Sequence, residues 1–323
     1  MYVYDIDDLL GPKEGRFFGA GFKRVDHTLS NISFEFHQVG DDPFLGKGQI
    51  SAEGNLIYPD DWSIKSNHFV RPHLSTIDAI VFGSEIAESY LSNIFEFRDI
   101  DLNSSLIEKC QISAGSEPIE NLENFQITGT YQNKKHSSKV VSVFKLLVGN
   151  LKINLTISHL ILGNQVNSEI NLGILRGDVQ NYNSLGYRDT DYYLQKINIQ
   201  DDEIKYKTRI NRGNPTRGLE ANYFPFVTFI DAVILSGQIS QAFLYHLDDI
   251  SRSESNTLWM RKVSITRNKL LNHDTSFVGT TILNKSQIIK MGDSIYRSAI
   301  MTGEFSDVTI KYSVAHDISC KLI

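Results

Sequence analysis

One stretch of this chain occurs twice, and the duplication constrains the fold more than any other feature. Residues 77–91 read IDAIVFGSEIAESYL and residues 230–244 read IDAVILSGQISQAFL, with five of the fifteen positions identical. Average residue usage would give about one identity by chance. Most of the other positions hold residues of similar size and polarity. The chain is therefore expected to consist of two related units.

Both copies begin with the same helix-start signal. Ser75 stands three residues before Asp78, and Thr228 stands three residues before Asp231. This spacing is typical of a capping box. In a capping box, the hydroxyl of the first residue accepts a hydrogen bond from the backbone amide of the acidic residue, and the carboxylate accepts one from the backbone amide of the first residue. The segments that follow lack proline and are apolar around most of a helical circumference. A helix of that kind must be buried, so we predict one core helix in each unit.

The duplication extends into strands on both sides of the helices. His159 aligns with His316 in two alternating segments, KINLTISH and TIKYSVAH, and GFKRVDH from Gly21 aligns with GYRDTDY from Gly186. Gly149 and Asn150 interrupt a long alternating run, where they indicate a hairpin turn. We expect two units, residues 1–165 and residues 166–323, each with short strands, one long helix and then long antiparallel strands.

A curved antiparallel sheet wrapped around a central helix is the arrangement that buries such a helix on nearly all sides. This arrangement resembles the hotdog fold. We therefore predict an α+β protein built as a tandem double hotdog, with the two halves related by a pseudo-twofold axis. The alternative is a pair of separate α+β layers packed side by side.

Composition limits the classes of partner and site. The net charge of −6 argues against nucleic acid, which needs clustered Lys and Arg. The two cysteines, Cys110 and Cys320, are too few for a disulfide scaffold. The acidic start MYVYDIDDLL is unlike a signal peptide, and no apolar run is long enough to span a membrane. The chain has no HExxH, paired CxxC or P-loop motif. We expect a soluble cytoplasmic protein that uses neither metal nor cofactor.

The loop before the first helix holds the clearest candidate catalytic residues. His73 and Asp78 lie in RPHLSTIDA, which is similar to the HPxxLDA segment of polyketide dehydratase domains. In a second register, Gly83 aligns with the glycine that opens the helix of bacterial acyl-carrier-protein dehydratases, and Glu88 then takes the catalytic position. Both registers keep His73 as the proton-transfer residue, and they differ in the carboxylate. The simplest interpretation of Glu85 and Glu88 is a solvated stripe on the helix.

The second copy has lost several of these polar groups. Pro225-Phe226 replaces Pro72-His73, and Gln238 and Gln241 replace Glu85 and Glu88. One active site for the pair of units would produce this asymmetry. We predict that His73 acts from the first unit and that Asp231 faces it across the pseudo-twofold axis. An imidazole with an ordinary pKa near 6.5 is suited to general base catalysis at neutral pH.

Four segments give the chain its resemblance to a known family, the avirulence protein D (AvrD) family of plant-associated bacteria. They are LGPKEGRFFGAGFKRV, YPDDW, RPHLSTIDAIVFGSEIAESYL and LWMRKVSI. The resemblance implies the synthesis of syringolides, lipid elicitors made from a β-ketoacyl chain and the pentulose D-xylulose. It also implies kinship with A-factor-type butenolide synthases, which are double hotdogs.

The function implied by the resemblance is condensation of a β-ketoacyl thioester with a ketose. The donor is expected to be an acyl-carrier-protein or coenzyme A thioester held in a tunnel between helix and sheet, and the enzyme a monomer or homodimer. We expect the helix N-termini at Ser75 and Thr228 to polarise the thioester carbonyl. Arg71, Glu85 and Gln238 are further candidates for substrate binding. The alternatives are a dehydratase, a thioesterase or a non-catalytic acyl-binding protein.

Overall fold

The computed structural model describes residues 4–42, 44–65, 68–69, 71–136, 139–160, 169–255, 258–268, 275–292 and 294–319. Its long elements fall into two series. The strands of the first series are β1 (Asp26–Glu35), β3 (Gly46–Ile57), β6 (Leu106–Ser113), β7 (Phe125–His136), β8 (Lys139–Val148), β9 (Leu151–Leu160) and β10 (Glu169–Arg176). Those of the second are β11 (Thr190–Gln200), β12 (Glu203–Arg212), β13 (Trp259–Arg267), β14 (Ser276–Met291), β15 (Ser294–Phe305) and β16 (Val308–Asp317).

Two long helices accompany these strands, α2 (Thr76–Ile94) in the first series and α4 (Phe229–Asp248) in the second. The shorter elements are the helices α1 (Ile6–Leu10) and α3 (Asp99–Asn103), the strands β2 (His37–Gln38), β4 (Ile64–Lys65) and β5 (His68–Phe69), and five 3₁₀ turns. These turns are Lys13–Gly15, Gly21–Arg24, Gly186–Asp189, Ala221–Tyr223 and Arg252–Glu254.

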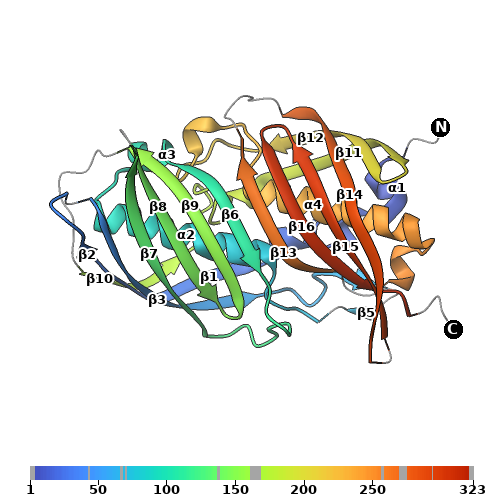
Figure 1. Ribbon diagram of the computed structural model, residues 1–323, viewed down its shortest axis with the longest axis horizontal. Helices are drawn as coiled ribbons and strands as arrows, with labels where there is room; N and C mark the ends of the chain where they lie inside the picture. Colours follow the sequence, from blue (N-terminus) through green and yellow to red (C-terminus); the bar gives the residue numbers. More distant parts are fainter. Residues whose placement is uncertain are drawn as a thin grey trace.

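The long strands form one antiparallel sheet whose order reflects the duplication. From one edge the order is β10-β1-β3-β7-β8-β9-β6, and it continues as β13-β16-β15-β14-β12-β11 to the other edge. Read from the outside inward, β1-β3-β7-β8-β9-β6 corresponds strand by strand to β11-β12-β14-β15-β16-β13. The two units join through β6 and β13, where Ser264 pairs with Gln111. Figure 1 shows the two halves side by side along the long axis of the molecule.

Both predicted core helices are present, and both predicted caps are confirmed. The Ser75 hydroxyl accepts from the Asp78 amide, and the Thr228 hydroxyl accepts from the Asp231 amide, each with the reciprocal carboxylate bond. Each sheet half curves around its own helix, with β1, β8 and β9 contacting α2 and β15 and β16 contacting α4. This is the double hotdog expected from the sequence.

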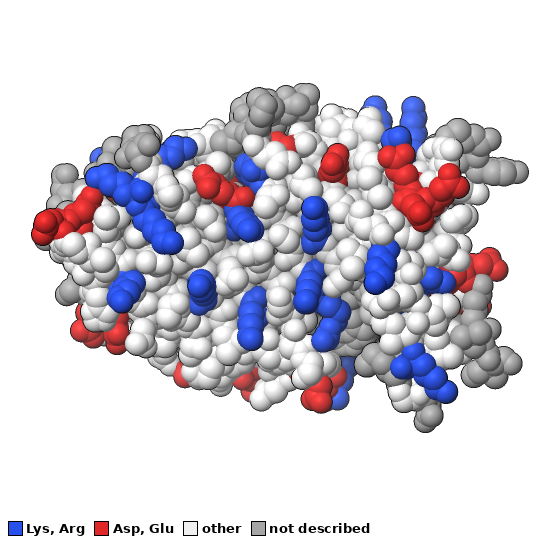
Figure 2. All heavy atoms as spheres, in the orientation of Figure 1, with Lys and Arg blue, Asp and Glu red and all other residues white. Residues whose placement is uncertain are grey.

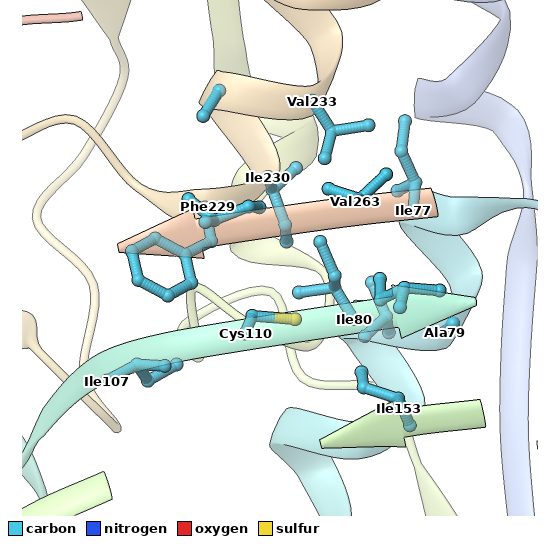
Figure 3. Packing of buried hydrophobic residues seen from close by; sticks show 14 of the residues in the cluster. Ile77, Ala79, Ile80, Ile107, Cys110, Ile153, Phe229, Ile230, Val233 and Val263 are labelled. Atoms are coloured by element: carbon cyan, nitrogen blue, oxygen red, sulfur yellow. The ribbon is translucent and has the colours of Figure 1, made fainter. Parts of the chain in front are cut away.

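The two helices meet near the junction of the units. Figure 3 shows Ile77 and Ile80 of α2 approaching Ile230 and Val233 of α4, beside Val263 of β13. These five side chains are at most 3% exposed and belong to a single hydrophobic core. Because that core runs through both units, neither helix is packed against its own half alone.

The chain also crosses between the units. β10, which follows the predicted boundary at residues 165 and 166, pairs with β1 of the first unit. In the opposite direction, α1 contacts α4 and β11, and Tyr4 forms an isolated bridge with Ile197. Elements near the start of each predicted unit therefore pack on the other unit.

Three smaller expectations can be compared with the structure. The hairpin turn at Gly149 is confirmed: it joins β8 to β9, and the glycine has a φ of 57°. Cys110 is a buried free thiol, whereas Cys320 lies outside the described residues. In the described part of the chain, no helix has the length and apolar character needed to cross a membrane.

Candidate active site

Asp78, at the start of α2, is the centre of a buried hydrogen-bond cluster. Its Oδ1 lies 2.8 Å from Nε2 of His27, and its Oδ2 accepts from the Tyr58 hydroxyl at 2.6 Å and from the Ser75 amide at 2.7 Å. The Asp78 side chain is 1% exposed and the His27 side chain is fully buried. β1 therefore delivers a histidine to the helix N-terminus, with Asp78 holding one of its ring nitrogens.

The environment keeps the Asp78 carboxylate ionised. Burial alone would raise its pKa, but the hydrogen bonds and charge of His27 and the bonds from Tyr58 and Ser75 outweigh burial and lower the pKa below its usual value. The other ring nitrogen of His27, Nδ1, is buried and lacks a hydrogen-bond partner among the described residues. A polar atom in that state is uncommon in proteins.

The second unit builds a different cluster around the equivalent aspartate. Asp231 forms a buried ion pair with Arg212, and it accepts from the hydroxyls of Tyr182 at 3.0 Å and Tyr192 at 2.7 Å. We expected Asp231 to face His73 across the pseudo-twofold axis. Instead its carboxylate is occupied by side chains of its own unit, because Arg212 brings a permanent positive charge to it.

His73 lies apart from the Asp78 hydrogen-bond cluster, on the wall of a pocket. The pocket opens at the N-terminal end of α2, where it is lined by Ser75 and Thr76 of the first unit and by Trp259 and Arg261 of the second. We expected an acyl tunnel between helix and sheet. The side chains between α2 and the sheet form part of the packed core, and the open space lies at the helix end instead.

Aromatic rings surround His73. Its imidazole packs at 4.9 Å from the ring of Trp259 and at 5.7 Å from that of Trp62. Phe17 contacts both Trp62, at 5.0 Å, and Tyr58, at 6.2 Å, and so connects this pocket wall to the Asp78 cluster. The pocket thus combines aromatic and aliphatic walls with one imidazole and the charged residues Glu117, Arg252 and Arg261, a composition typical of small-molecule sites.

The hydrogen bonding of His73 fixes its tautomer. Its Nδ1 lies 3.3 Å from the backbone carbonyl of Arg71, which can only accept, so Nδ1 carries the proton and Nε2 keeps its lone pair. Burial lowers the pKa of His73 below its ordinary value of 6.5. The imidazole is therefore neutral at pH 7, with Nε2 able to accept a proton.

Glu85 and Glu88 are not the solvated stripe expected from the sequence. Glu88 is 6% exposed, and it accepts from the side chain of Asn181 and, at 2.6 Å, from the backbone amide of Leu219. Glu85 accepts from the Ser184 hydroxyl. The polar face of α2 is covered because segments of the second unit fold over it. Burial raises the pKa of Glu88 to about 7.

The remaining candidates for substrate binding lie in different environments. Arg71 is 77% exposed and pairs with Glu120 at 2.6 Å, on an open cleft beside the main pocket. Thr228 caps α4, and its hydroxyl lies 2.9 Å from that of Tyr182. Gln238 is buried within α4. Of these residues and Ser75, only Ser75 lines the pocket that contains His73.

Sequence reasoning missed several polar residues of these clusters, His27 and Tyr58 in the first unit and Tyr182, Tyr192 and Arg212 in the second. A signal for two of them was present. The alignment of GFKRVDH with GYRDTDY places His27 and Tyr192 at the same repeat position, and both contact the repeated aspartate. Among the described residues, no group of His, Cys, Asp and Glu side chains is arranged to hold a metal ion.

Solved structures with a similar fold include acyl thioesterases and dehydratases. A tesB protein from Mycobacterium avium subsp. paratuberculosis has 10% sequence identity and a TM-score of 0.39, covering 87% of this chain and 96% of its own. A putative oleoyl thioesterase from Lactobacillus plantarum has 7% identity and a TM-score of 0.40, covering 88% and 96%. The dehydratase domain from the CurJ module of the curacin polyketide synthase has 7% identity and a TM-score of 0.35, covering 90% and 98%.

Comparison with curated protein sequences gives no significant match. The family comparison is decisive, because the model of the Pseudomonas avirulence D protein (AvrD) matches residues 2–319, nearly the whole chain. The chain belongs to the AvrD family.

Proposed function

We propose that the chain condenses a β-ketoacyl thioester with a ketose such as D-xylulose, in the pocket that contains His73. One observation supports this choice above the others. All four segments that give the chain its family resemblance contribute side chains to that pocket: Phe17, Trp62, His73 and Trp259 come from one segment each. Segments far apart in the sequence meet at one place, which is what a shared reaction site requires.

In the proposed reaction, Nε2 of His73 is the general base. It accepts the proton of a ketose hydroxyl, whose oxygen attacks the thioester carbon. The new C–O bond forms, the C–S bond breaks, and the thiol leaves with the proton that His73 returns. The resulting β-ketoester closes by an aldol step, in which the acidic carbon between its two carbonyls adds to the ketose carbonyl. General base catalysis of this kind typically contributes about 10²- to 10⁴-fold in rate.

The start of α2 is suited to the negative charge that develops on the thioester oxygen. Ser75 and Thr76 line the pocket at the N-terminus of this 19-residue helix, and the positive end of the helix dipole points toward the space beside them. The Asp78 cluster holds this end of the helix in place through Ser75 and Tyr58. We assign Asp78 a positioning role in the proposed reaction, because its oxygens are already bound by other groups.

The test uses purified protein with 3-oxooctanoyl pantetheine and D-xylulose, and mass spectrometry of the products. The wild type should form the adduct, and His73→Gln should lower kcat by at least about 10²-fold. His136→Ala, which changes an exposed histidine at the end of β7, is the matched control and should be unaffected. Adduct formation at the wild-type rate by His73→Gln would refute the assignment of the base.

The same mixtures separate the competing functions. Release of free acid without a need for xylulose would identify a thioesterase. Dehydration of a 3-hydroxyoctanoyl thioester would identify a dehydratase. Saturable binding of the thioester with no product from the wild type would identify an acyl-binding protein. Each of these three results would overturn the proposed condensation.

A further inference from the structure

The outer face of the sheet is positively charged at its centre. The strands β8, β9, β6, β13 and β16 are consecutive in the sheet, and each presents an exposed lysine near its middle or inner end on the side away from the helices, with Lys139 as a second one at the start of β8. In strand order these are Lys145, Lys152, Lys109, Lys262 and Lys311, which we call the lysine face. Figure 2 shows Lys and Arg side chains spread over the middle of this side of the molecule, with most of the acidic residues toward its margins.

The lysine face carries few compensating charges. None of its five lysines forms an ion pair with a residue that the structure describes, although Lys13, Lys23, Lys135 and Lys205 do so elsewhere. The acidic residues on the same strands and side are Glu108, which is the chain neighbour of Lys109, and Asp317, which is the last residue of β16, so the lysines outnumber the carboxylates. A chain with a net charge of −6 therefore keeps a predominantly cationic area at the centre of its sheet.

The lysine face borders the mouth of the His73 pocket. Lys152 and Lys262 both pair in register with Ser113 of β6, one from each side. Because neighbouring strands lie about 4.8 Å apart, the two lysine backbones are roughly 10 Å apart. The chain neighbours of these three residues line the pocket. They are Leu151 beside Lys152, Arg261 beside Lys262 and Ala114 beside Ser113. A partner bound on this face would thus stand beside the entrance of the proposed reaction site.

We infer that the lysine face is the docking site of an acidic acyl carrier protein, which delivers the β-ketoacyl chain into the pocket on its prosthetic arm. The inference rests on the proposed function, and it selects the carrier protein over coenzyme A as donor. Complementary charge is the first argument, because cationic and anionic surfaces steer each other and increase the association rate. The second argument is that the exposed side chain of Leu147, which lies opposite Lys152, offers apolar contact area to a protein partner on the same face.

The experiment compares two donors on the same enzyme, a 3-oxooctanoyl-loaded bacterial acyl carrier protein and 3-oxooctanoyl pantetheine, which has no protein surface. In the Lys152→Glu/Lys262→Glu variant, KM for the carrier thioester should rise about tenfold or more, which corresponds to about 1.4 kcal/mol. The kinetics with the pantetheine thioester should stay at the wild-type level. The Lys152→Gln/Lys262→Gln variant should give a smaller rise in KM, because it removes charge without reversing it.

The matched control is Lys47→Glu/Lys207→Glu. Lys47 is exposed on β3, three strands from the strand of Lys152. Lys207 is exposed on β12, four strands from the strand of Lys262. The control makes the same charge change and should leave both donors unaffected. Added salt should raise the wild-type KM for the carrier thioester toward that of the Lys152→Glu/Lys262→Glu variant, because the Debye length falls from about 10 Å at 0.1 M to 3 Å at 1 M.

Failure of the inference and failure of the proposed function give different results. If the wild type converts the pantetheine thioester while charge reversal leaves the KM for the carrier thioester unchanged, the docking inference is refuted and the function stands. 3-Oxooctanoyl-coenzyme A serves as a third donor, and if charge reversal raises KM only for this donor, the lysine face binds nucleotide phosphates instead. Binding of the wild type to phosphatidylglycerol vesicles in place of the carrier would identify a membrane surface. If the wild type converts neither thioester, the proposed function itself fails.

Discussion

His27 and Tyr192 occupy the same position of the duplicated unit, and each binds the aspartate at the start of the helix in its own unit. His27 Nε2 lies 2.8 Å from Asp78, and the Tyr192 hydroxyl lies 2.7 Å from Asp231. The second unit adds Arg212, which forms a buried ion pair with Asp231. One copy of the site therefore keeps a titratable partner for its aspartate, and the other copy has a permanently charged one.

This difference predicts unequal losses of stability. Asp231→Asn leaves the Arg212 guanidinium, whose side chain is 3% exposed, without its counter-charge. Breaking a buried ion pair in this way costs about 3–5 kcal/mol. Asp78→Asn should cost less, about 1–3 kcal/mol, because it weakens the hydrogen bonds to His27, Tyr58 and Ser75 without leaving a permanent charge unpaired. Urea unfolding midpoints of the two variants would measure the difference.

A second substitution tests the cause. Arg212→Met in the Asp231→Asn background removes the unpaired charge, so the double variant should unfold at a higher urea concentration than Asp231→Asn alone. Equal midpoints for the single and double variants would show that the unpaired guanidinium is not what destabilises the protein.

The sequence predicted the scaffold well because its signals are local or repeated. The capping boxes at Ser75 and Thr228 need only three-residue spacing, and the turn at Gly149 needs one residue at a φ of 57°. The double hotdog followed from a duplication that needs no knowledge of contacts. Periodicity, capping and turn chemistry are all properties of neighbouring residues.

The site was harder to predict because it depends on which strands reach the helix. His27 and Asp78 are 51 residues apart, and only the curvature of β1 around α2 brings them together. The polar face of α2 was predicted to meet solvent because the pattern of Glu85 and Glu88 is that of an exposed stripe. In the structure it is covered by Asn181 and Leu219, which lie 93 and 131 residues after Glu88 in the chain. Such long-range contacts leave no trace in local spacing.

The raised pKa of the buried Glu88 carboxyl predicts that the stability of the folded protein falls as the pH rises. Burial raises its pKa from 4.5 to about 7, so the folded protein holds a proton that the unfolded chain releases near pH 4.5. The contribution of that proton is fully present below the unfolded pKa and is lost as the pH rises through 7. The difference between the pKa of Glu88 in the unfolded chain and in the folded protein corresponds to about 3 kcal/mol of stability at most, since one pKa unit is about 1.36 kcal/mol.

The test of this prediction is Glu88→Gln. The glutamine resembles the protonated acid: its oxygen can accept from the Leu219 amide, and its NH₂ can donate to the Asn181 oxygen after a flip of that amide. Compared with the wild type, the variant should gain stability at pH 8 and differ little at pH 5, as measured by thermal unfolding across that range. Parallel stability curves for the two proteins would contradict the role given to Glu88.

The close packing around Gly48 in β3 predicts that no larger residue fits at this position. A Cβ built on this residue would lie 1.7 Å from the carbonyl oxygen of Glu35, a backbone atom that side-chain rotation cannot move away. Gly48→Ala should therefore destabilise the protein by more than about 2 kcal/mol, in the range of overpacked cores. Gly173→Ala is the control, since a Cβ there meets nothing within 4 Å. Equal melting temperatures for the two variants would refute the close approach.

The pocket itself makes the last prediction, through the pKa of His73. Burial against aromatic rings lowers that pKa below 6.5, so kcat/KM for adduct formation should fall only when the pH drops below 6.5, where the imidazole becomes protonated and can no longer act as a base. Trp259→Ala removes the ring that lies 4.9 Å from the imidazole and admits water. The pKa of His73 should then rise toward 6.5, and the acid limb of the pH–rate profile should move to higher pH with it.

Trp259→Phe keeps a ring against His73 and should keep the limb close to its wild-type position. Titration of the His73 ring followed by NMR measures the same pKa without turnover, and the two measurements should agree in all three proteins. An acid limb that stays in place in Trp259→Ala while the NMR pKa of His73 rises would mean that another group accepts the proton. His27, whose Nδ1 is buried without a partner among the described residues, would then be the next residue to test.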